Sequence, residues 1–412
     1  MKYLAQSLLL FPLLISCSEI NDDANNDLVR DNEKPVIIKD SSSTIADFKY
    51  DVEVIDRNIV YQKVSSFQVG NSNEPNYGDL SLFGAFRLVP YTGEEFNKKY
   101  TIDDIVEYLD KSLYIYPDST NYSGNAPDLT LNILPFTSAV TFSELKLQSN
   151  PTNVGPSIGN VTFSGIAKSM VKIPIDDVAY INTLLKASQT DSTDKIKDFF
   201  RYHNGFMIKS SSTDINRSQA FYAYGVASGY QPELKVKVRV IKNGIADTVS
   251  ATFGIESANQ LSNFNPSAAW DNTNFDSIKY VSYSGKRLKI KFDATNFFDK
   301  PVSIYNANLK LKYSGSSLFG TMGYFTLYGS NSDSTLLTPL SYSNTSEKGF
   351  YSFNLSSWLQ AWNINPTLNH GFYILNADDA TSVSHITFYL NDSDPAKKAK
   401  ITVLYSERQG AK

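Results

Sequence analysis

The sequence predicts an all-β protein made of two β-sandwich, jelly-roll-like units with a small helical insertion. First, the chain of 412 residues is rich in aromatic side chains, with 26 Tyr and 25 Phe, which favour pleated, half-buried surfaces. Second, short runs of alternating apolar and polar residues are separated by turns rich in Gly, Pro, Asn and Ser, a pattern typical of sandwich sheets. Third, no strand–helix–strand rhythm indicates a parallel sheet.

The alternating runs predict strands in both halves of the chain. They lie at 48–54, 80–88, 129–133, 161–163, 234–240, 288–292, 309–313, 325–327 and 401–405. We therefore expect an N-terminal sandwich over residues 46–235 and a C-terminal sandwich over 236–412. A boundary near 232–245 and one in the Asn/Ser-rich stretch 258–276 are both compatible with this pattern.

Helical spacing interrupts the strands in one main region, near 176–203. Asp176 and Asp177 precede apolar residues spaced three to four apart, and acidic residues suit a helix N-terminus. A second helix is expected over 193–204. Residues 101–109 fit a helix start, although the residues that follow alternate as in a strand. Trp358 and Trp362, four residues apart, predict a short amphipathic helix packed on the sandwich.

The N-terminus predicts a lipoprotein signal peptide over residues 1–16. Lys2 precedes an apolar run that is too short to span a bilayer, and residues 14–17 resemble the bacterial lipobox. In that motif the cysteine, here Cys17, is diacylated, becomes the new N-terminus and is then acylated on its amino group. An ordinary signal peptide with an incidental cysteine is the alternative. Three acyl chains would anchor the protein durably in a membrane.

Residues 17–45 read as an acidic, flexible tether that lifts the body of the protein off the membrane. Acidic residues directly after the lipidated cysteine resemble the surface-export signal of Bacteroidota lipoproteins. This resemblance implies an outer-membrane location facing the cell exterior. A solvated tether with no routing role is the alternative.

Composition excludes one class of partner and one source of stability. The formal net charge is −4 with no clustered basic motif, so we expect no nucleic acid partner. Cys17 is the only cysteine, so no intrachain disulfide supports the fold, which must rest on its apolar cores.

Four segments together resemble a family of Bacteroidota surface lipoproteins known only as a domain of unknown function. These segments are 69–78, 199–209, 353–375 and 394–405. The last of them is also similar to carbohydrate-binding-like β-sandwich modules, although Ala399 stands where those modules usually have a proline. The resemblance implies a surface lipoprotein and implies no reaction.

Motifs for catalysis are few, so we expect no enzyme activity, no cofactor and no metal. The three histidines are far apart and lack zinc spacing, and no nucleophile motif is present. A surface polysaccharide hydrolase is the alternative, with Asp378 and Asp392 as its acid/base pair. Asp392 and Asp394 also offer oxygen ligands for a structural Ca²⁺, but the Gly and Glu of an EF-hand loop are missing, so a solvated turn is favoured.

The sequence therefore favours a non-catalytic binding or accessory module. Its expected partners are the membrane through the acyl anchor, a glycan, and an outer-membrane transporter or secretion complex. Trp270, in a loop, is the candidate for an exposed ring that stacks on a sugar. The alternative interpretation is that this tryptophan holds its own loop in place.

Overall fold

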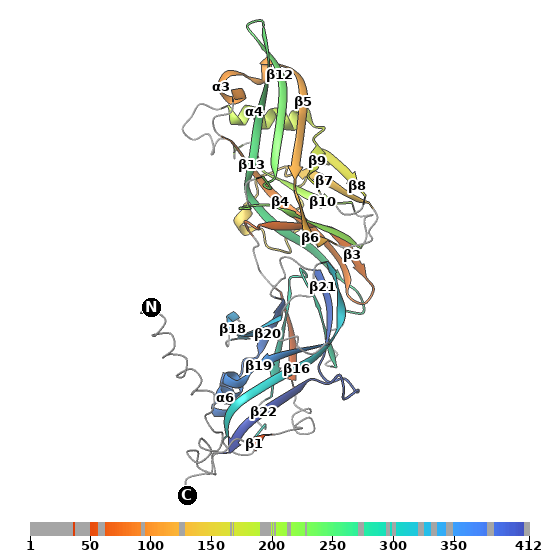
Figure 1. Ribbon diagram of the computed structural model, residues 1–412, viewed down its shortest axis with the longest axis vertical. Helices are drawn as coiled ribbons and strands as arrows, with labels where there is room; N and C mark the ends of the chain where they lie inside the picture. Colours follow the sequence, from red (N-terminus) through yellow and green to blue (C-terminus); the bar gives the residue numbers. More distant parts are fainter. Residues whose placement is uncertain are drawn as a thin grey trace, which may run out of the picture.

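The computed structural model confirms the all-β prediction, with 57% strand and 13% helix and with antiparallel sheets. Figure 1 shows an elongated molecule with two lobes arranged along its long axis. The structure describes residues 36–37, 50–56, 62–91, 95–122, 128–164, 167, 169–189, 199, 201, 203–211, 216–226, 229–270, 276–293, 297–298, 302–319, 325–330, 336–342, 349–376 and 383–407. Within these ranges no helix is long and apolar enough to cross a membrane.

The upper lobe of Figure 1, which we call the insert lobe, contains one 11-stranded sheet of described residues. Its strands are β3 (Ser66–Glu74), β4 (Gly78–Pro90), β5 (Ile105–Ile115), β6 (Pro117–Tyr122), β7 (Leu129–Pro135), β8 (Gly159–Phe163), β9 (Val171–Pro174), β10 (Phe206–Ser210), β11 (Arg217–Tyr222), β12 (Glu233–Lys242) and β13 (Ile245–Pro266). The sheet branches at β4, because one edge of this strand pairs with β3 over its first part and with β10 over its second.

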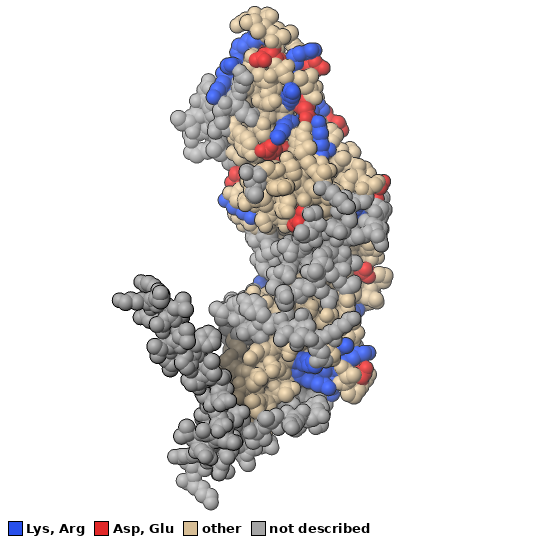
Figure 2. Space-filling model, in the orientation of Figure 1, with Lys and Arg blue, Asp and Glu red and all other residues tan. Residues whose placement is uncertain are grey.

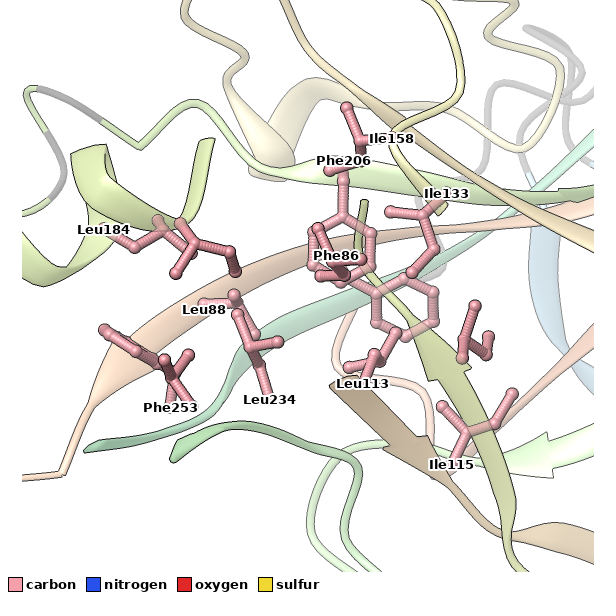
Figure 3. Close-up of a cluster of buried hydrophobic side chains, with 14 of the residues drawn as sticks. Phe86, Leu88, Leu113, Ile115, Ile133, Ile158, Leu184, Phe206, Leu234 and Phe253 are labelled. Atoms are coloured by element: carbon pink, nitrogen blue, oxygen red, sulfur yellow. The ribbon is translucent and has the colours of Figure 1, made fainter. Parts of the chain in front are cut away.

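The two branches of this sheet face each other across one core. Phe163 of β8 lies edge-on to Phe221 of β11, with ring centroids 6.4 Å apart, although the two strands lie on different branches. Side chains from both branches and from helix α4 (Val178–Ser188) fill the space between them, as Figure 3 shows for part of the cluster. This apolar burial is the main stabilising term of the lobe.

Helix α4 confirms the prediction for the start of the helical insertion. Asp177 is its N-cap, and its carboxylate accepts a hydrogen bond from the Tyr180 backbone N–H at 3.0 Å. Ile181, Leu184 and Leu185 are buried, as their spacing predicts. Most of the second helix expected at 193–204 lies outside the described residues.

The helix considered for residues 101–109 is not formed, and this expectation is corrected. Short helix α3 (Glu95–Lys99) precedes this region, and a single 3-10 turn, η3 (Ile102–Asp104), is followed at once by strand β5. The Asp104 carboxylate accepts a hydrogen bond from the Thr101 backbone N–H at 2.8 Å. Asp104 therefore caps a turn, and the apolar residues after it belong to a strand.

The lower lobe, which we call the sandwich lobe, packs two sheets face to face. The described strands of one sheet are β1 (Val36–Ile37), β14 (Ser277–Val281), β16 (Val302–Phe319), β19 (Phe350–Asn354), β21 (Val383–Tyr389) and β22 (Lys400–Glu407). Those of the other are β2 (Tyr50–Asp56), β15 (Lys286–Phe292), β17 (Phe325–Ser330), β18 (Leu336–Tyr342) and β20 (Phe372–Asn376). Side chains from both sheets share one core.

A short helix closes this core as the tryptophan spacing predicts. Helix α6 (Ser356–Ile364) buries Leu359 and Trp362, each 1% exposed. Trp358 packs against the same core, and its ring fills the space beside Gly329 on β17 that a side chain there would need. Two small 3-10 turns are also present, η4 (Phe142–Glu144) and η5 (Pro366–Leu368).

The chain is divided between the lobes differently from the predicted boundary at residues 235/236. That boundary falls inside β12, which pairs on both sides within the insert lobe, with β13 and with β5. Strand β2, in contrast, pairs with β15 of the sandwich lobe. The insert lobe, residues 62–266, therefore lies in the chain between β2 and β14, and both of these strands belong to the sandwich lobe.

The two lobes meet at a small apolar junction. Its buried members are Leu80, Leu82, Leu147, Val281 and Tyr283. Tyr77, in the turn between β3 and β4, stacks on His385 of β21 with ring centroids 5.1 Å apart. The Tyr77 hydroxyl also shares a hydrogen bond with the Thr387 hydroxyl at 2.8 Å. One turn of the insert lobe is thus held on the outer side of the six-stranded sheet.

Candidate functional site

Trp270 lies at the junction of the lobes rather than on an open surface. Its ring is half-buried, edge-on to Phe264 at 5.2 Å and tilted to Tyr77 at 6.4 Å. The Trp270 backbone N–H donates to the Ser267 carbonyl at 2.9 Å and closes a turn. These contacts agree with the interpretation that this tryptophan holds its loop in place.

Of the other predicted site residues, the structure describes Asp392 and Asp394. Cys17 and Asp378 lie outside the described residues. Asp392 and Asp394 each accept a hydrogen bond at 2.9 Å from a backbone N–H two residues further on, at Asp394 and Ala396 respectively. They therefore stabilise a turn. Within the described ranges no group of three His, Cys, Asp or Glu residues is arranged to hold a metal ion.

Two of the three histidines are buried, and they differ in their hydrogen bonding. His203 Nε2 accepts a hydrogen bond from the Leu88 backbone N–H at 3.2 Å. Neither ring nitrogen of His385 has a hydrogen-bond partner among the described residues. Burial, reinforced by the charge of Arg87, lowers the pKa of His203 to about 3, and burial lowers the pKa of His385 to about 4. Both rings are neutral at pH 7.

The structure assembles a surface that sequence reasoning missed, which we call the tyrosine face. It consists of Tyr91, Tyr114, Tyr116, Tyr222 and Tyr230, with the charged residues Asp110, Lys172, Glu233 and Lys235. These residues come from the ends of β4, β5, β9, β11 and β12 and the segments beside them. Tyr230 is 53% exposed, and the other four rings are half-buried or at the edge of exposure.

Contacts between rings build one end of the tyrosine face. Tyr230 lies 5.9 Å from Tyr116 and 5.6 Å from Tyr222, edge-on to both. The Tyr222 backbone N–H donates to the Tyr116 carbonyl at 2.8 Å, which fixes the two supporting tyrosines relative to each other. The exposed ring of Tyr230 is thus held by two neighbours, an arrangement that presents a rigid aromatic surface at low entropic cost.

Paired charges build the other end of the tyrosine face. The ammonium groups of Lys172 and Lys235 lie 5.6 Å and 5.5 Å from the centroid of the Tyr114 ring. Lys172 pairs with Asp110 at 3.0 Å and Lys235 with Glu233 at 2.9 Å. Tyr91 donates to Glu233 at 3.2 Å, and its ring occupies the space that a side chain at Gly254 would fill.

Hydrogen bonds within these pairs shift the pKa values of Asp110, Lys172 and Lys235 in favour of their charged forms. Burial favours the neutral form of Asp110, but hydrogen bonds from Tyr114, Ser112 and Lys172 outweigh it and lower the pKa of that carboxyl. The hydrogen bond to Glu233 raises the pKa of Lys235, and the hydrogen bond to Asp110 raises that of Lys172. With two lysine–carboxylate pairs, the tyrosine face carries no formal net charge.

Such a surface suits a neutral ligand that is rich in hydroxyl groups. Aromatic faces pack against the C–H faces of sugar rings, while carboxylates and ammonium groups bond to sugar hydroxyls as acceptors and donors. Figure 2 shows the corresponding mixture of acidic and basic side chains on the upper lobe. The sequence signal was weak: tyrosines two apart at 114 and 116 predict a shared strand face, but nothing in the sequence indicates that 222 and 230 join them.

Comparison of the chain with family models, with curated proteins and with solved structures finds no match.

Proposed function

We propose that this protein is a non-catalytic surface lipoprotein that binds glycans through the tyrosine face. The observation that carries the proposal is the exposed Tyr230 ring, supported by Tyr116 and Tyr222 beside charge-balanced polar groups. The Cys17 motif and the acidic residues after it support an outer-membrane anchor with the body facing the cell exterior.

The positions of the first two described strands support an orientation for the anchored protein. The first described segment, β1, pairs with β22, and the next, β2, pairs with β15, so the chain enters the body through the sandwich lobe. An anchor at Cys17 would then hold the sandwich lobe closer to the membrane. The insert lobe with its tyrosine face would extend toward the surroundings, where a glycan is accessible.

Binding is tested with a glycan array, followed by titration of the best neutral glycan into purified protein. Tyr230→Ala is expected to weaken binding about tenfold, equivalent to about 1.4 kcal/mol. Tyr305→Ala is the matched control, because Tyr305 is similarly exposed at 50% but lies on the sandwich lobe. Equal affinity of both variants and the parent protein would exclude the tyrosine face. Cleavage of a glycan by the pure protein would instead support the hydrolase alternative.

The anchor is tested separately from binding. Mass spectrometry of the N-terminal peptide is expected to show a triacylated Cys17, and protease treatment of intact cells is expected to degrade the protein. An unmodified cysteine would refute the anchor, and full protection from protease would refute the outward orientation.

A partner in the outer membrane is a second candidate, favoured by one observation at the far end of the insert lobe. Ile241 and Ile245 flank the turn of the β12–β13 hairpin and are 46% and 72% exposed. Apolar side chains at such a tip suit contact with another protein. Cross-linking from position 245 in intact outer membranes tests it, since a partner should be captured there and not from position 305.

A further inference from the structure

A second surface, on the sandwich lobe, has a different chemical character. In β16 the buried residues Leu309 and Leu311 alternate with Lys310 and Lys312, so both lysines lie on the outer side of the six-stranded sheet. The same alternation places Lys400 of β22 outside, next to the buried Ile401. We call this surface the lysine face.

The pairing register arranges the lysine face in two neighbouring rows. In one row Lys312 lies opposite Phe350 of β19 on one side and opposite Tyr389 of β21 on the other. In the next row Lys310 lies opposite Ser352 and Lys400. The ammonium groups of Lys310 and Lys312 both lie 4.5 Å from the centroid of the Phe350 ring.

A fourth lysine, Lys397, extends the first row. The ammonium group of Lys397, in the turn before β22, lies 5.4 Å from the centroid of the Tyr389 ring. The Tyr389 hydroxyl shares a hydrogen bond with Ser314 at 2.8 Å, which fixes the ring on the sheet. Two aromatic rings are thus bordered by ammonium groups on a surface formed by strands rather than by loops.

Basic side chains predominate on the lysine face. Lys310 and Lys400 lie directly opposite each other in the pairing register. Asp394, in the turn before β22, lies 4.0 Å from Lys397. Figure 2 shows basic side chains gathered on the lower lobe, in contrast to the mixed charges above.

We propose that the lysine face binds an anionic polysaccharide whose repeating sugars carry carboxylate or sulfate groups. Lysines two residues apart on one strand are separated by roughly 7 Å, and lysines on paired strands by about 5 Å. A linear polymer with regularly repeated acidic groups can contact several of them at once, while Phe350 and Tyr389 pack against its sugar rings. The proposal does not depend on the tyrosine face, because that surface has no net charge.

The test uses the full-length protein in detergent and three probes: alginate, heparin and the neutral polymer dextran. Thermophoresis at 50 mM and 200 mM NaCl is expected to show binding of the two polyanions that weakens with salt, and no binding of dextran to this surface. The double variant Lys312→Gln/Lys400→Gln is expected to bind the polyanions at least tenfold more weakly. Its melting temperature should stay close to that of the parent, because both substituted lysines lie on the outer side of the sheet.

Matched controls separate this surface from general electrostatics. The double variant Lys186→Gln/Lys291→Gln removes the same charge from exposed positions on α4 and β15 and is expected to keep most of the affinity. Tyr230→Ala should leave polyanion binding unchanged. Phe350→Leu removes the ring and keeps an apolar side chain, and it is expected to weaken polyanion binding several-fold. If the lysine double variant does not fold, the result for Phe350→Leu decides whether the lysine face binds the polymer.

Three results would overturn the proposal. One is undiminished polyanion binding by both Lys312→Gln/Lys400→Gln and Phe350→Leu. Another is an equal loss in the Lys186→Gln/Lys291→Gln control. The last is tighter binding to vesicles of anionic phospholipid than to either polyanion, lost in the same variants, which would identify the partner as a membrane surface.

Discussion

The two lobes are built from the chain in opposite ways. The insert lobe uses one continuous stretch, from β3 to β13, whereas the sandwich lobe combines β1 and β2 with strands that begin after residue 276. Both lobes nevertheless depend on pairings between distant segments. In the insert lobe β4 pairs with β13, so that Phe86 lies opposite Ala258, and in the sandwich lobe β2 pairs with β15. Because the entropy of loop closure grows only slowly with loop length, it costs the two lobes similar amounts. Insertion at such a point is compatible with an independent core in each lobe.

Core substitutions should show whether the lobes are separate cooperative units, and they should have the largest effect. Phe86 and Phe325 are 1% and 0% exposed, each in ring contact with neighbours in its own lobe. Alanine at either site should lower the free energy of unfolding by about 3–5 kcal/mol. Hydrogen exchange should locate the lost protection mainly in the insert lobe for Phe86→Ala and mainly in the sandwich lobe for Phe325→Ala. Uniform loss over both lobes would mean that the junction couples them into one unit.

Acid should destabilise both lobes through their buried histidines. In the unfolded chain each imidazole takes up a proton near pH 6.5, whereas in the folded protein His385 stays neutral down to a pKa of about 4 and His203 down to about 3. Above pH 6.5 the two histidines therefore do not reduce the free energy of unfolding. It falls by about 1.4 kcal/mol per pH unit for each histidine as the pH decreases toward 4. Chemical denaturation at a series of pH values measures this slope.

Phenylalanine substitutions sharpen the comparison between these two histidines. His385→Phe should remove one histidine's share of the acid slope and leave stability at pH 7 unchanged or higher, because the ring nitrogens have no partner among the described residues. His203→Phe should also flatten the slope but cost about 1–3 kcal/mol at pH 7, since the Leu88 N–H loses its acceptor. Identical acid slopes in His385→Phe and the parent would show that His385 is not neutral in the folded state.

The smallest expected effect is confined to the insert lobe. Asp177→Ala removes the N-cap of α4 and should lower the free energy of unfolding by about 1 kcal/mol. The neighbouring Asp176, exposed and outside the cap position, is the matched control, and Asp176→Ala should change stability by less than about 0.5 kcal/mol. Thermal unfolding of both variants decides this. An equal loss in the two would mean that general charge near the helix, rather than the cap, stabilises α4.

The sequence predicts the strands well because alternation follows directly from the two faces of a sheet. It misleads in β5 for a specific reason. The pairing of β5 with β12 skips Leu109 and Val106, which are bulged and 45% and 53% exposed. Two bulges shift the alternation of the apolar residues, so that their spacing resembles that of a helix. Local pattern alone cannot distinguish the two cases.

The division into lobes and the candidate surfaces are less accessible to sequence analysis, because they depend on which strands pair. Alternation in β12 and β13 is the same whichever sheet they join, so the predicted boundary at 235/236 had no physical signal behind it. The tyrosine face joins residues from separate strands, and the lysine face depends on the register that places Lys400 opposite Lys310. Trp270 illustrates the converse: its loop position suggested exposure, but only the junction reveals its packing partners.

The early strands also determine how the protein responds to mechanical load. A force applied between the N-terminal segment and the sandwich lobe acts first on β1 and β2. Strand β1 is held at two paired positions of β22, whereas β2 is held along seven paired residues of β15. A pull along the β2 axis loads the hydrogen bonds to β15 in parallel rather than one after another. The longer of these two links is therefore a shear joint, the geometry of strand pairing that resists extension best.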